Sequence, residues 1–396
     1  MKKIINVLLL TIILASSTVF AKEVESEVVV KEEKPSYKAI LLGDDKGKIY
    51  YSENIDEKYP LASLTKMMTL MVTFDQLEKG SIKMKDKIKV SKKSAQTGGS
   101  RIPMKEGEVF TLEDLIKATA IYSANNAAYA IAEYIGKGDV DKFVKMMNKK
   151  SIDLGLEKEL EFYTPAGLPS DMTKKGMDSG TTRGIYKLSL EAAKYSQYMD
   201  IASMKEATIH DGKLKIKNRN LLLGEEGIYG IKTGHHSKVG YNISVLSDKE
   251  SMQIFTVVVG GPTYKKRDES VLKKMEEFYE HYQFRKLTDK NIAIAKVPIF
   301  SGDKEYADLY PDKSFTDILN KDSDIKISIK RNKGAIAPVE AGKVLGEYKV
   351  VIDGNVVETG KLITKEEIKL SISLKNIFWK YKEILGKDYN IRIKKY

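Results

Sequence analysis

The sequence of 396 residues has no cysteine, four histidines and one tryptophan. Without cysteine there can be no disulfide, no thiol nucleophile and no cysteine that carries a lipid. The histidines at 210, 235, 236 and 281 do not form an H-E-x-x-H or similar ligand spacing, which argues against a zinc hydrolase. We therefore expect no metal and no cofactor.

Long apolar runs are also scarce. After the first 21 residues, no segment approaches the roughly 20 uninterrupted apolar residues of a membrane-spanning helix, which excludes a polytopic membrane protein. A hydrophobic content of 42% is nevertheless enough for a packed core. The length favours two domains over one.

Basic residues outnumber acidic residues by 67 to 55, which gives a formal net charge of +12. Such an excess points to an acidic partner: nucleic acid, an anionic membrane or an anionic wall polymer. We expect no nucleic acid partner, because the N-terminus predicts export and no zinc-finger or RNA-binding signature is present. A lysine-rich surface without a specific partner is the simpler alternative.

The N-terminus has the pattern of a signal peptide. Two lysines precede an apolar run from Ile4 to Ala15, and Val19-Phe20-Ala21 fits a cleavage site. We assign residues 1–21 to the signal peptide and the charged residues 22–36 to a leader. The expected location is the cell envelope, in the periplasm or on the outer face of the cytoplasmic membrane, with peripheral attachment.

Residues 37–287 have the pattern of an α/β domain with strands at both ends and helices between them. Turn residues at 44–47 join two β-like runs into a predicted hairpin. Apolar residues at three- and four-residue intervals predict a helix over Ser63–Gly80. Strands are expected within 218–261, and an amphipathic helix over about 269–282.

Residues 288–372 predict a smaller all-β domain. Ile325–Lys330 alternates strictly between apolar and polar residues, as a half-buried strand does. Asp353-Gly354-Asn355 separates two further β-like runs, which predicts a hairpin.

The last residues, 373–396, form a basic amphipathic pattern. Seven Lys or Arg residues stand against Glu383 and Asp388, a net charge of +5. Such a helix can lie on an anionic membrane surface and would attach the protein there. Packing of the helix on the β domain is the alternative, and the alternation at 389–393 is more typical of a strand.

Three short motifs occur in one order along the chain: Ser63-Leu64-Thr65-Lys66, Ser123-Ala124-Asn125 and Lys232-Thr233-Gly234. Each motif is weak alone, since S-x-x-K and S-x-N recur elsewhere, whereas K-T-G occurs once. Together they indicate a serine acyl-transfer site whose base is a lysine.

Ser63 and Lys66 are three residues apart, so at the start of a helix both side chains lie on one face. Lysine accepts the serine proton only if its pKa is lowered, and a second cation, for which Lys232 is the candidate, would lower it. Ser123 and Asn125 lie between helix-like segments, where they could relay a proton and hold a substrate amide. The K-T-G residues can hold a carboxylate and let substrate approach the backbone. Helix capping and an ordinary strand end are the simpler alternatives.

The residues around the motifs resemble a known family. Pro60–Thr69 is similar to the nucleophile region of that family. Gly230–His235, together with Gly240-Tyr241-Asn242, is similar to its third motif. Asn218-Arg219-Asn220 is similar to a segment that binds the substrate carboxylate. The chain thus resembles the low-molecular-mass penicillin-binding proteins, serine-type D-alanyl-D-alanine carboxypeptidases. The resemblance implies an α/β (α+β) catalytic domain with a mainly antiparallel sheet and a helical subdomain, then a small all-β domain and an amphipathic C-terminal helix.

The resemblance also implies roles for the residues. Ser63 would be acylated by the penultimate D-alanine of a peptidoglycan pentapeptide, and Lys66 would take its proton. Ser123 would protonate the departing D-alanine. Among the substrate-binding residues, Asn125 would hold the peptide amide and Lys232 would stabilise charge. Thr233, Gly234 and Arg219 would lie around the carboxylate. The backbone N–H of His235 would form the oxyanion hole together with that of Ser63. β-Lactams would acylate the same serine.

Two other functions share parts of this pattern. A class A β-lactamase needs a glutamate that activates the deacylating water, usually in E-x-x-L-N, and Glu161 is instead followed by Phe-Tyr-Thr-Pro. A non-catalytic wall-binding scaffold would have no reason to retain both serines and both lysines of the motifs. One departure from the family is His236, where many members have threonine, and it bears on the finer substrate contacts.

Overall fold

The structure, a computed structural model, describes residues 36–371. The predicted signal peptide, the leader up to residue 35 and the predicted tail at 373–396 lie outside the described residues. None of the helices in the described part is long and apolar enough to cross a membrane.

A five-stranded antiparallel sheet forms the centre of the first domain, in the order β10-β11-β12-β1-β2. Its strands are β1 (Ala39–Asp44), β2 (Ile49–Glu53), β10 (Ile228–His236), β11 (Gly240–Lys249) and β12 (Met252–Gly261). β1 and β2 form the hairpin that the turn residues predict. Because β1 pairs with β12, the sheet joins the first strands of the domain to its last.

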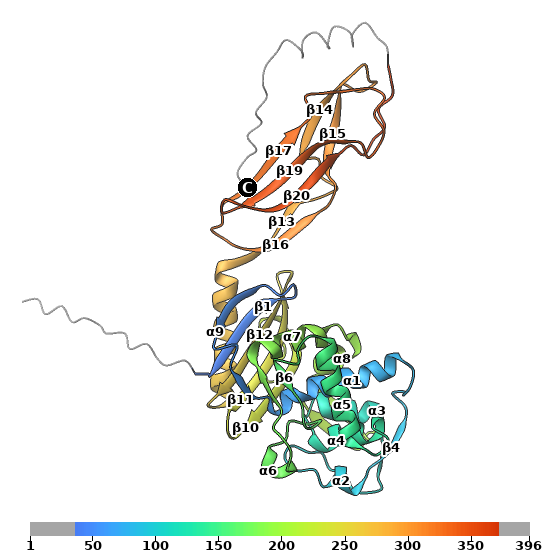
Figure 1. Cartoon of the computed structure of the whole chain (residues 1–396), viewed down its shortest axis with the longest axis vertical. Coiled ribbons are helices and arrows are strands. Elements are labelled where there is room, and N and C mark those ends of the chain that lie inside the picture. Colours follow the sequence, from blue (N-terminus) through green and yellow to red (C-terminus); the bar gives the residue numbers. More distant parts are fainter. Residues whose placement is uncertain (1–35, 372–396) are drawn as a thin grey trace, which may run out of the picture. The chain divides into compact units, whose positions relative to one another are not determined.

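Both faces of this sheet are buried. Residues alternate between the faces of a strand, and on β12 Phe255 and Val257 join one core cluster while Ile254 and Val258 join another. The helix α9 (Tyr264–His281) packs on one face, and α7 (Thr182–Ala193) packs on the other (Figure 1). Burial on both faces explains why β12 is apolar along almost its whole length.

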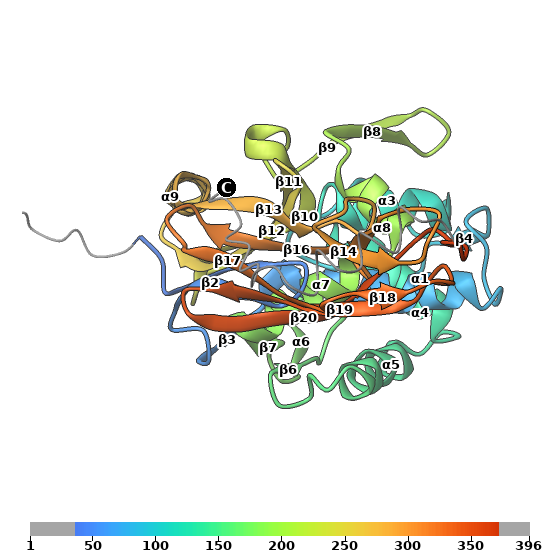
Figure 2. The same ribbon diagram turned by 90° about the horizontal axis from the view of Figure 1, so that it is seen from above.

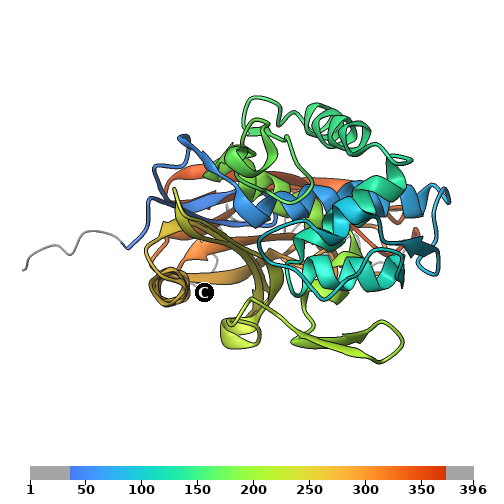
Figure 3. The ribbon, with the colours of Figure 1, turned by 90° about the horizontal axis from the view of Figure 1, so that it is seen from below.

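The helices between β2 and β10 gather around α1 (Thr65–Glu78), as Figure 3 shows in blue to green. The sequence predicts one apolar face for α1, but its residues from Thr65 to Phe74 are buried on all sides. The helices α3 (Leu112–Ala120), α4 (Asn125–Ile135), α5 (Val140–Asp153) and α8 (Ser196–Ala202) contact α1, and α2 (Lys92–Ala95) contacts α4. The short helix α6 (Ser170–Thr173) follows α5 in the chain.

Short strands and turns connect these helices. A three-stranded sheet has the order β3-β7-β6, and β4 pairs with β5 and β8 with β9. The short elements are β3 (Lys58–Pro60), β4 (Lys87–Lys89), β5 (Val109–Thr111), β6 (Leu160–Glu161), β7 (Ser179–Thr181), β8 (Glu206–Ile209), β9 (Leu214–Lys217) and the 3-10 turns η1 (Ala62–Leu64) and η2 (Glu225–Gly227).

The C-terminal strands form an all-β domain, as predicted. There β13 (Tyr282–Thr288), which follows α9 directly, pairs with β16 (Phe315–Asn320), and a six-stranded sheet has the order β17-β19-β20-β15-β14-β18. Asp353 and Gly354 have φ of 50° and 82°, as a two-residue hairpin turn requires, so the predicted hairpin is present. The strands of the larger sheet are β14 (Ala295–Phe300), β15 (Tyr306–Pro311), β17 (Ile325–Arg331), β18 (Ala335–Ile336), β19 (Val344–Ile352) and β20 (Asn355–Ile363).

The last helix of the first domain begins earlier than its sequence prediction. α9 begins at Tyr264 rather than near Glu269. The reason is the cap at Thr263, whose side chain accepts a hydrogen bond from the backbone N–H of Lys266 at 3.1 Å. The polar first turn that follows has no apolar spacing by which a helix could be predicted.

Candidate active site

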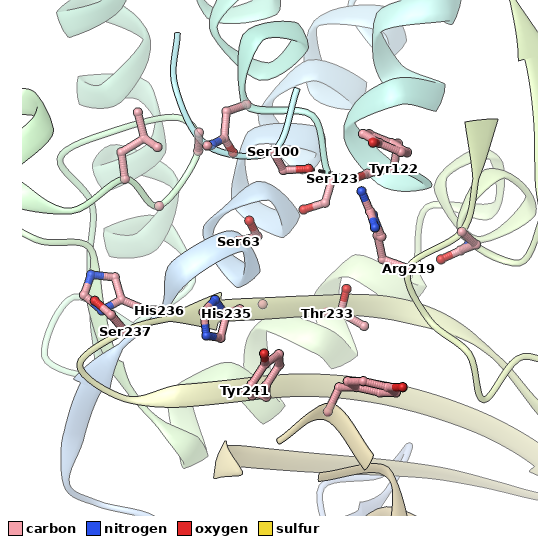
Figure 4. Close-up of a pocket in the computed structure, with 18 of the residues that line it drawn as sticks. Ser63, Ser100, Tyr122, Ser123, Arg219, Thr233, His235, His236, Ser237 and Tyr241 are labelled. Atoms are coloured by element: carbon pink, nitrogen blue, oxygen red, sulfur yellow. Dashed lines mark hydrogen bonds between the residues drawn. The ribbon is translucent and has the colours of Figure 1, made fainter. Parts of the chain in front are cut away.

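The three motifs meet at one cavity of about 1110 Å³. Ser63 lies in η1, Ser123 in the turn between α3 and α4, and Thr233 on β10. Figure 4 shows these side chains around the cavity, together with that of Arg219. Of the other predicted site residues, Asn125, Gly234 and His235 also line the cavity, and Lys66 and Lys232 are buried next to them.

Lys66 is 0% exposed, and its amine contacts the predicted nucleophile. Its Nζ lies 2.8 Å from Ser63 Oγ, 2.7 Å from Asn125 Oδ1 and 2.9 Å from the carbonyl oxygen of Ala166. Ser63 does not cap the helix, because the N-cap residue of α1 is Leu64, which has no side-chain cap. The hydroxyl of Ser63 is therefore paired with the amine and not with the helix end.

Two buried lysines dominate the electrostatics of the cavity. Burial lowers the pKa of Lys66 well below its ordinary value, and the charge of Lys232 lowers it further, while Asp178 acts in the opposite direction. Lys232 is itself 2% exposed, and burial, followed by the charges of Arg267 and Arg219, lowers its pKa to about 7. The second cation predicted from the sequence is present, but desolvation is the larger cause of the pKa shift.

Ser123 combines an uncommon backbone conformation with an unused hydroxyl. Its φ of 64° lies in the left-handed region, which costs a non-glycine residue about 1–3 kcal/mol. The N-cap of α4 is Ala124, so Ser123 does not cap that helix. Its Oγ is buried and has no hydrogen-bond partner among residues 36–371. A free hydroxyl in this position can pass a proton to a substrate.

β10 is an edge strand, and Gly234 on it packs against the turn that carries Ser63. A Cβ atom at Gly234 would lie 3.2 Å from the carbonyl oxygen of Leu61 and 3.3 Å from the backbone nitrogen of Ser63. This close approach of two backbones requires a residue without a side chain. The neighbouring His235 is exposed, and its ring lies 4.2 Å from that of Tyr241.

Arg219 presents a cation to the cavity. Its guanidinium carbon lies 4.2 Å from the centre of the Tyr122 ring, and its backbone N–H donates to the carbonyl of Ile121 at 3.1 Å. Within residues 36–371 the arginine ion pairs are those of Arg183 and Arg267, so Arg219 has no carboxylate partner there. A guanidinium stacked in this way can bind the carboxylate of a ligand.

A buried acid supports the site and was missed by the sequence analysis. The carboxylate of Asp178, 1% exposed, accepts hydrogen bonds from the hydroxyl of Thr164 at 2.5 Å and from its backbone N–H at 2.9 Å. Thr164 Oγ1 in turn accepts from the N–H of Gly167 at 2.9 Å. These bonds hold the turn whose Ala166 carbonyl contacts Lys66. Burial raises the pKa of Asp178 to about 6.

Acidic residues do not line the cavity in the described part of the chain. Glu161, the glutamate considered for a β-lactamase, is exposed on β6 and accepts a hydrogen bond from the hydroxyl of Tyr163 at 2.5 Å. Within 36–371 there is also no group of three or more side chains that could hold a metal ion.

His236 is buried at the end of β10 and lines the cavity. Its Nδ1 accepts a hydrogen bond from the N–H of Lys238 at 3.0 Å, and its Nε2 has no hydrogen-bond partner among the described residues. Burial, with a smaller effect of Lys238, lowers the pKa of the imidazole below its ordinary value, which favours the neutral ring. At this position, where the resemblance implies threonine, the chain therefore places a buried imidazole.

Comparison with protein families gives two matches. Residues 25–263 match a family described as D-alanyl-D-alanine carboxypeptidase, and residues 282–370 match the C-terminal domain of penicillin-binding protein 5. All three motifs lie inside the first match.

Individual proteins are similar over most of the chain. D-alanyl-D-alanine carboxypeptidase DacF of Bacillus subtilis is 31% identical over 383 residues, which cover 93% of this chain and 95% of that protein. D-alanyl-D-alanine carboxypeptidase DacA of Escherichia coli is 29% identical over 340 residues, which cover 83% and 82%. The crystal structure of penicillin binding protein 5 from Haemophilus influenzae has a TM-score of 0.64 at 26% identity, and the match covers 86% of this chain and 99% of that one.

Proposed function

The chain belongs to the D-alanyl-D-alanine carboxypeptidase family of serine-type penicillin-binding proteins, and we propose that Ser63 is the residue that its substrate acylates. The observation that carries this proposal is the 2.8 Å contact between Ser63 Oγ and the buried amine of Lys66. The substrate is a peptidoglycan pentapeptide that ends in D-Ala-D-Ala, and the reaction removes the last D-alanine.

In the acylation step, neutral Lys66 accepts the proton of Ser63 while Oγ attacks the carbonyl carbon of the penultimate D-alanine. Burial and the charge of Lys232 lower the pKa of this amine, which favours the neutral form that can act as a base. Its two N–H bonds can then donate to Asn125 Oδ1 and to the carbonyl of Ala166, which directs the lone pair at Ser63. The site thus holds the base in the orientation that proton transfer needs.

Breakdown of the tetrahedral intermediate needs a proton for the departing D-alanine. The unpartnered hydroxyl of Ser123 supplies it and takes in exchange the proton that Lys66 accepted from Ser63, so that Ser123 is restored and Lys66 is neutral again. The charge of Lys232 stabilises this step. Arg219 and Thr233 hold the carboxylate of the leaving group. The oxyanion accepts hydrogen bonds from the N–H of His235 and from that of the nucleophile.

Asn125 serves both the base and the substrate. Its Oδ1 accepts from Lys66, and one proton of Nδ2 is donated to the carbonyl of Gly98 at 2.8 Å. The second Nδ2 proton remains for a carbonyl of the peptide, in agreement with the role that the family resemblance implies.

Water then hydrolyses the acyl-enzyme, with Lys66 as the base. β-Lactams acylate the same serine and leave slowly, because no glutamate lines the cavity in residues 36–371 to activate water for rapid hydrolysis. The class A β-lactamase alternative lacks its deacylating acid for the same reason. A non-catalytic scaffold would not need a buried, pre-aligned pair such as Ser63 and Lys66.

We also propose that the signal peptide at 1–21 directs export to the cell envelope. The domain at 37–287 carries out catalysis, and the β domain at 288–372 follows it in the chain. Residues 373–396 would attach the protein peripherally to the membrane. The support is the sequence pattern and the net charge of +5 in the last stretch. Deletion of 373–396 should release the mature protein from anionic liposomes. If the intact mature protein does not sediment with such liposomes, the membrane attachment is wrong.

The direct test of the activity is release of D-alanine from a pentapeptide that ends in D-Ala-D-Ala. Ser63→Ala should abolish release, and Ser301→Ala, which changes the serine of another S-x-x-K sequence, should not. Rapid steady-state turnover of nitrocefin without a long-lived acyl-enzyme would instead support the β-lactamase alternative.

A further inference from the structure

A lysine-rich segment at residues 83–93 lies outside the catalytic cavity and has no role in the proposed reaction. It contains one acidic residue, Asp86, and six lysines: Lys83, Lys85, Lys87, Lys89, Lys92 and Lys93. The chain as a whole has 67 Lys and Arg among 396 residues, which corresponds to about two in a segment of this length. The basic composition of the chain therefore does not account for the lysine segment.

All six lysines of the segment are exposed. The segment passes through a turn, in which the N–H of Asp86 donates to the carbonyl of Lys83 at 3.0 Å, and then through β4 and α2. On β4 the side chain of Ile88 is buried, so Lys87 and Lys89 lie together on the opposite face, about 7 Å apart. Figure 1 and Figure 2 both show β4 on the side of the helices away from the five-stranded sheet.

The protein does not neutralise these charges. Among the ion pairs of the described residues, none involves a lysine of the segment. The carboxylate of Asp86 instead accepts hydrogen bonds from the backbone N–H of Lys83 at 2.7 Å and from the hydroxyl of Tyr134 at 2.8 Å. Opposite the two lysines of β4, strand β5 places Thr111 and Val109, which carry no charge. The lysines therefore repel one another, and a ligand with several negative charges would relieve that repulsion.

We propose that the lysine segment binds a linear phosphodiester polymer of the cell envelope, at a site separate from the reaction at Ser63. Short lysine-rich segments are typical of sites that bind polyanions. All the cations here are lysines, which act as point charges on flexible stems, so they can follow the phosphates of a flexible chain without a fixed geometry. The protein meets such a polymer only after the export proposed above, and bound polymer would keep the enzyme in contact with the wall.

A polymer fits the lysine segment better than an anionic membrane does. Segments that lie in a membrane interface combine basic residues with exposed aromatic or aliphatic side chains that enter the bilayer. Residues 81–96 contain no Phe, Tyr or Trp. Ile88 and Val90 are buried at 5% and 1% exposure, and the half-buried Ile82 and Met84 pack against the core of the catalytic domain. The segment therefore offers charge without an apolar anchor, which is what a soluble polyanion needs.

The test measures the Kd of the mature protein for a fluorescently labelled poly(glycerol phosphate) chain at several salt concentrations. The segment variant combines Lys85→Gln, Lys87→Gln, Lys89→Gln and Lys92→Gln, and leaves out the two lysines that interact electrostatically with Asp86 and Asp141. The control variant removes the same charge at four exposed lysines elsewhere in the catalytic domain: Lys142→Gln, Lys145→Gln, Lys158→Gln and Lys265→Gln.

The Kd should be at least about tenfold weaker in the segment variant, on the scale of several exposed ion pairs, and within about twofold of wild type in the control. The salt dependence of the Kd should also become shallower in the segment variant, because fewer counterions are released from the polymer. Both variants should release D-alanine from the pentapeptide at the wild-type rate, since none of the replaced lysines lines the cavity. The segment variant should unfold at a urea concentration no lower than that of wild type, because it loses repulsion between like charges.

Three results would overturn the polymer site. Wild-type protein that does not bind the polymer at low salt would exclude it. Equal weakening in both variants would mean that net charge, and not the lysine segment, attracts the polymer. Loss of binding to phosphatidylglycerol vesicles in the segment variant alone, with an unchanged Kd for the polymer, would mean that the segment faces a membrane. Polymer binding through the segment in a protein that releases no D-alanine would support the site and contradict only the proposed function.

Discussion

The guanidinium carbon of Arg219 lies 4.2 Å from the centre of the Tyr122 ring. The ring holds the cation over the cavity beside Ser123, where no carboxylate of the described chain competes for it. The aromatic face therefore orients the group that is proposed to bind the carboxylate of the substrate.

Loss of that ring should weaken substrate binding. A partly exposed cation–π contact contributes about 1 kcal/mol, so Tyr122→Leu should raise KM for the pentapeptide roughly fivefold with a smaller change in kcat. Tyr122→Phe keeps the ring and should leave KM near the wild-type value. An equal loss in both variants would mean that the hydroxyl, and not the aromatic face, matters.

The bond between Asp178 and Thr164 should matter for both stability and acylation. Asp178→Asn replaces an acceptor oxygen by a donor in a buried site, and loss of hydrogen bonds to a charged group costs about 1.5–3 kcal/mol. We expect a lower free energy of unfolding in urea and slower labelling by penicillin, because the turn that positions Lys66 loosens. Asp171→Asn, at an exposed position nearby, is the control.

Asp178 should also give the stability a pH dependence. Its pKa is raised from 3.8 to about 6 in the folded protein, so the folded state binds more protons than the unfolded state between these values. The free energy of unfolding should therefore fall as pH rises from about 4 to about 6, by up to about 3 kcal/mol. Denaturation curves of wild type and Asp178→Asn across this range should differ in slope; parallel curves would show that the carboxylate does not titrate there.

The two buried lysines of the site, Lys66 and Lys232, predict a bell-shaped pH dependence of acylation. Activity should rise as Lys66 loses its proton, because the neutral amine is the proposed base and burial with the charge of Lys232 lowers its pKa well below the ordinary lysine value. It should fall on the alkaline side with a midpoint of about 7, where Lys232 loses its charge. In Lys232→Arg the alkaline limb should vanish, since the guanidinium stays charged. An unchanged alkaline limb in this variant would exclude Lys232 as its origin.

Local patterns were enough to predict the parts of the molecule that depend on neighbours in sequence. Asp353 and Gly354 supply the positive φ angles of a two-residue turn, so the hairpin between β19 and β20 could be predicted from turn chemistry alone. The spacing of Ser63 and Lys66 likewise places both on one helical turn, and their amine–hydroxyl contact follows from it.

Contacts between distant segments could not be predicted in this way. Asp178 and Thr164 are 14 residues apart and meet only when the turn before α6 folds back, so no spacing in the chain marks them. The glycine of K-T-G had an expected role towards substrate, whereas the structure adds the backbone of Ser63, contributed from 171 residues earlier (234 − 63), as its close neighbour. Tyr122 precedes the second motif directly, but only the fold brings Arg219 to its ring.

The most direct test of the central claim is the intact mass of the mature protein after incubation with benzylpenicillin, followed by peptide mapping. We predict that wild-type protein gains the mass of one penicillin, located on the peptide that contains Ser63, and that Ser63→Ala gains none. An adduct that persists in Ser63→Ala, or that maps to another serine in the wild type, would contradict the assignment of the nucleophile.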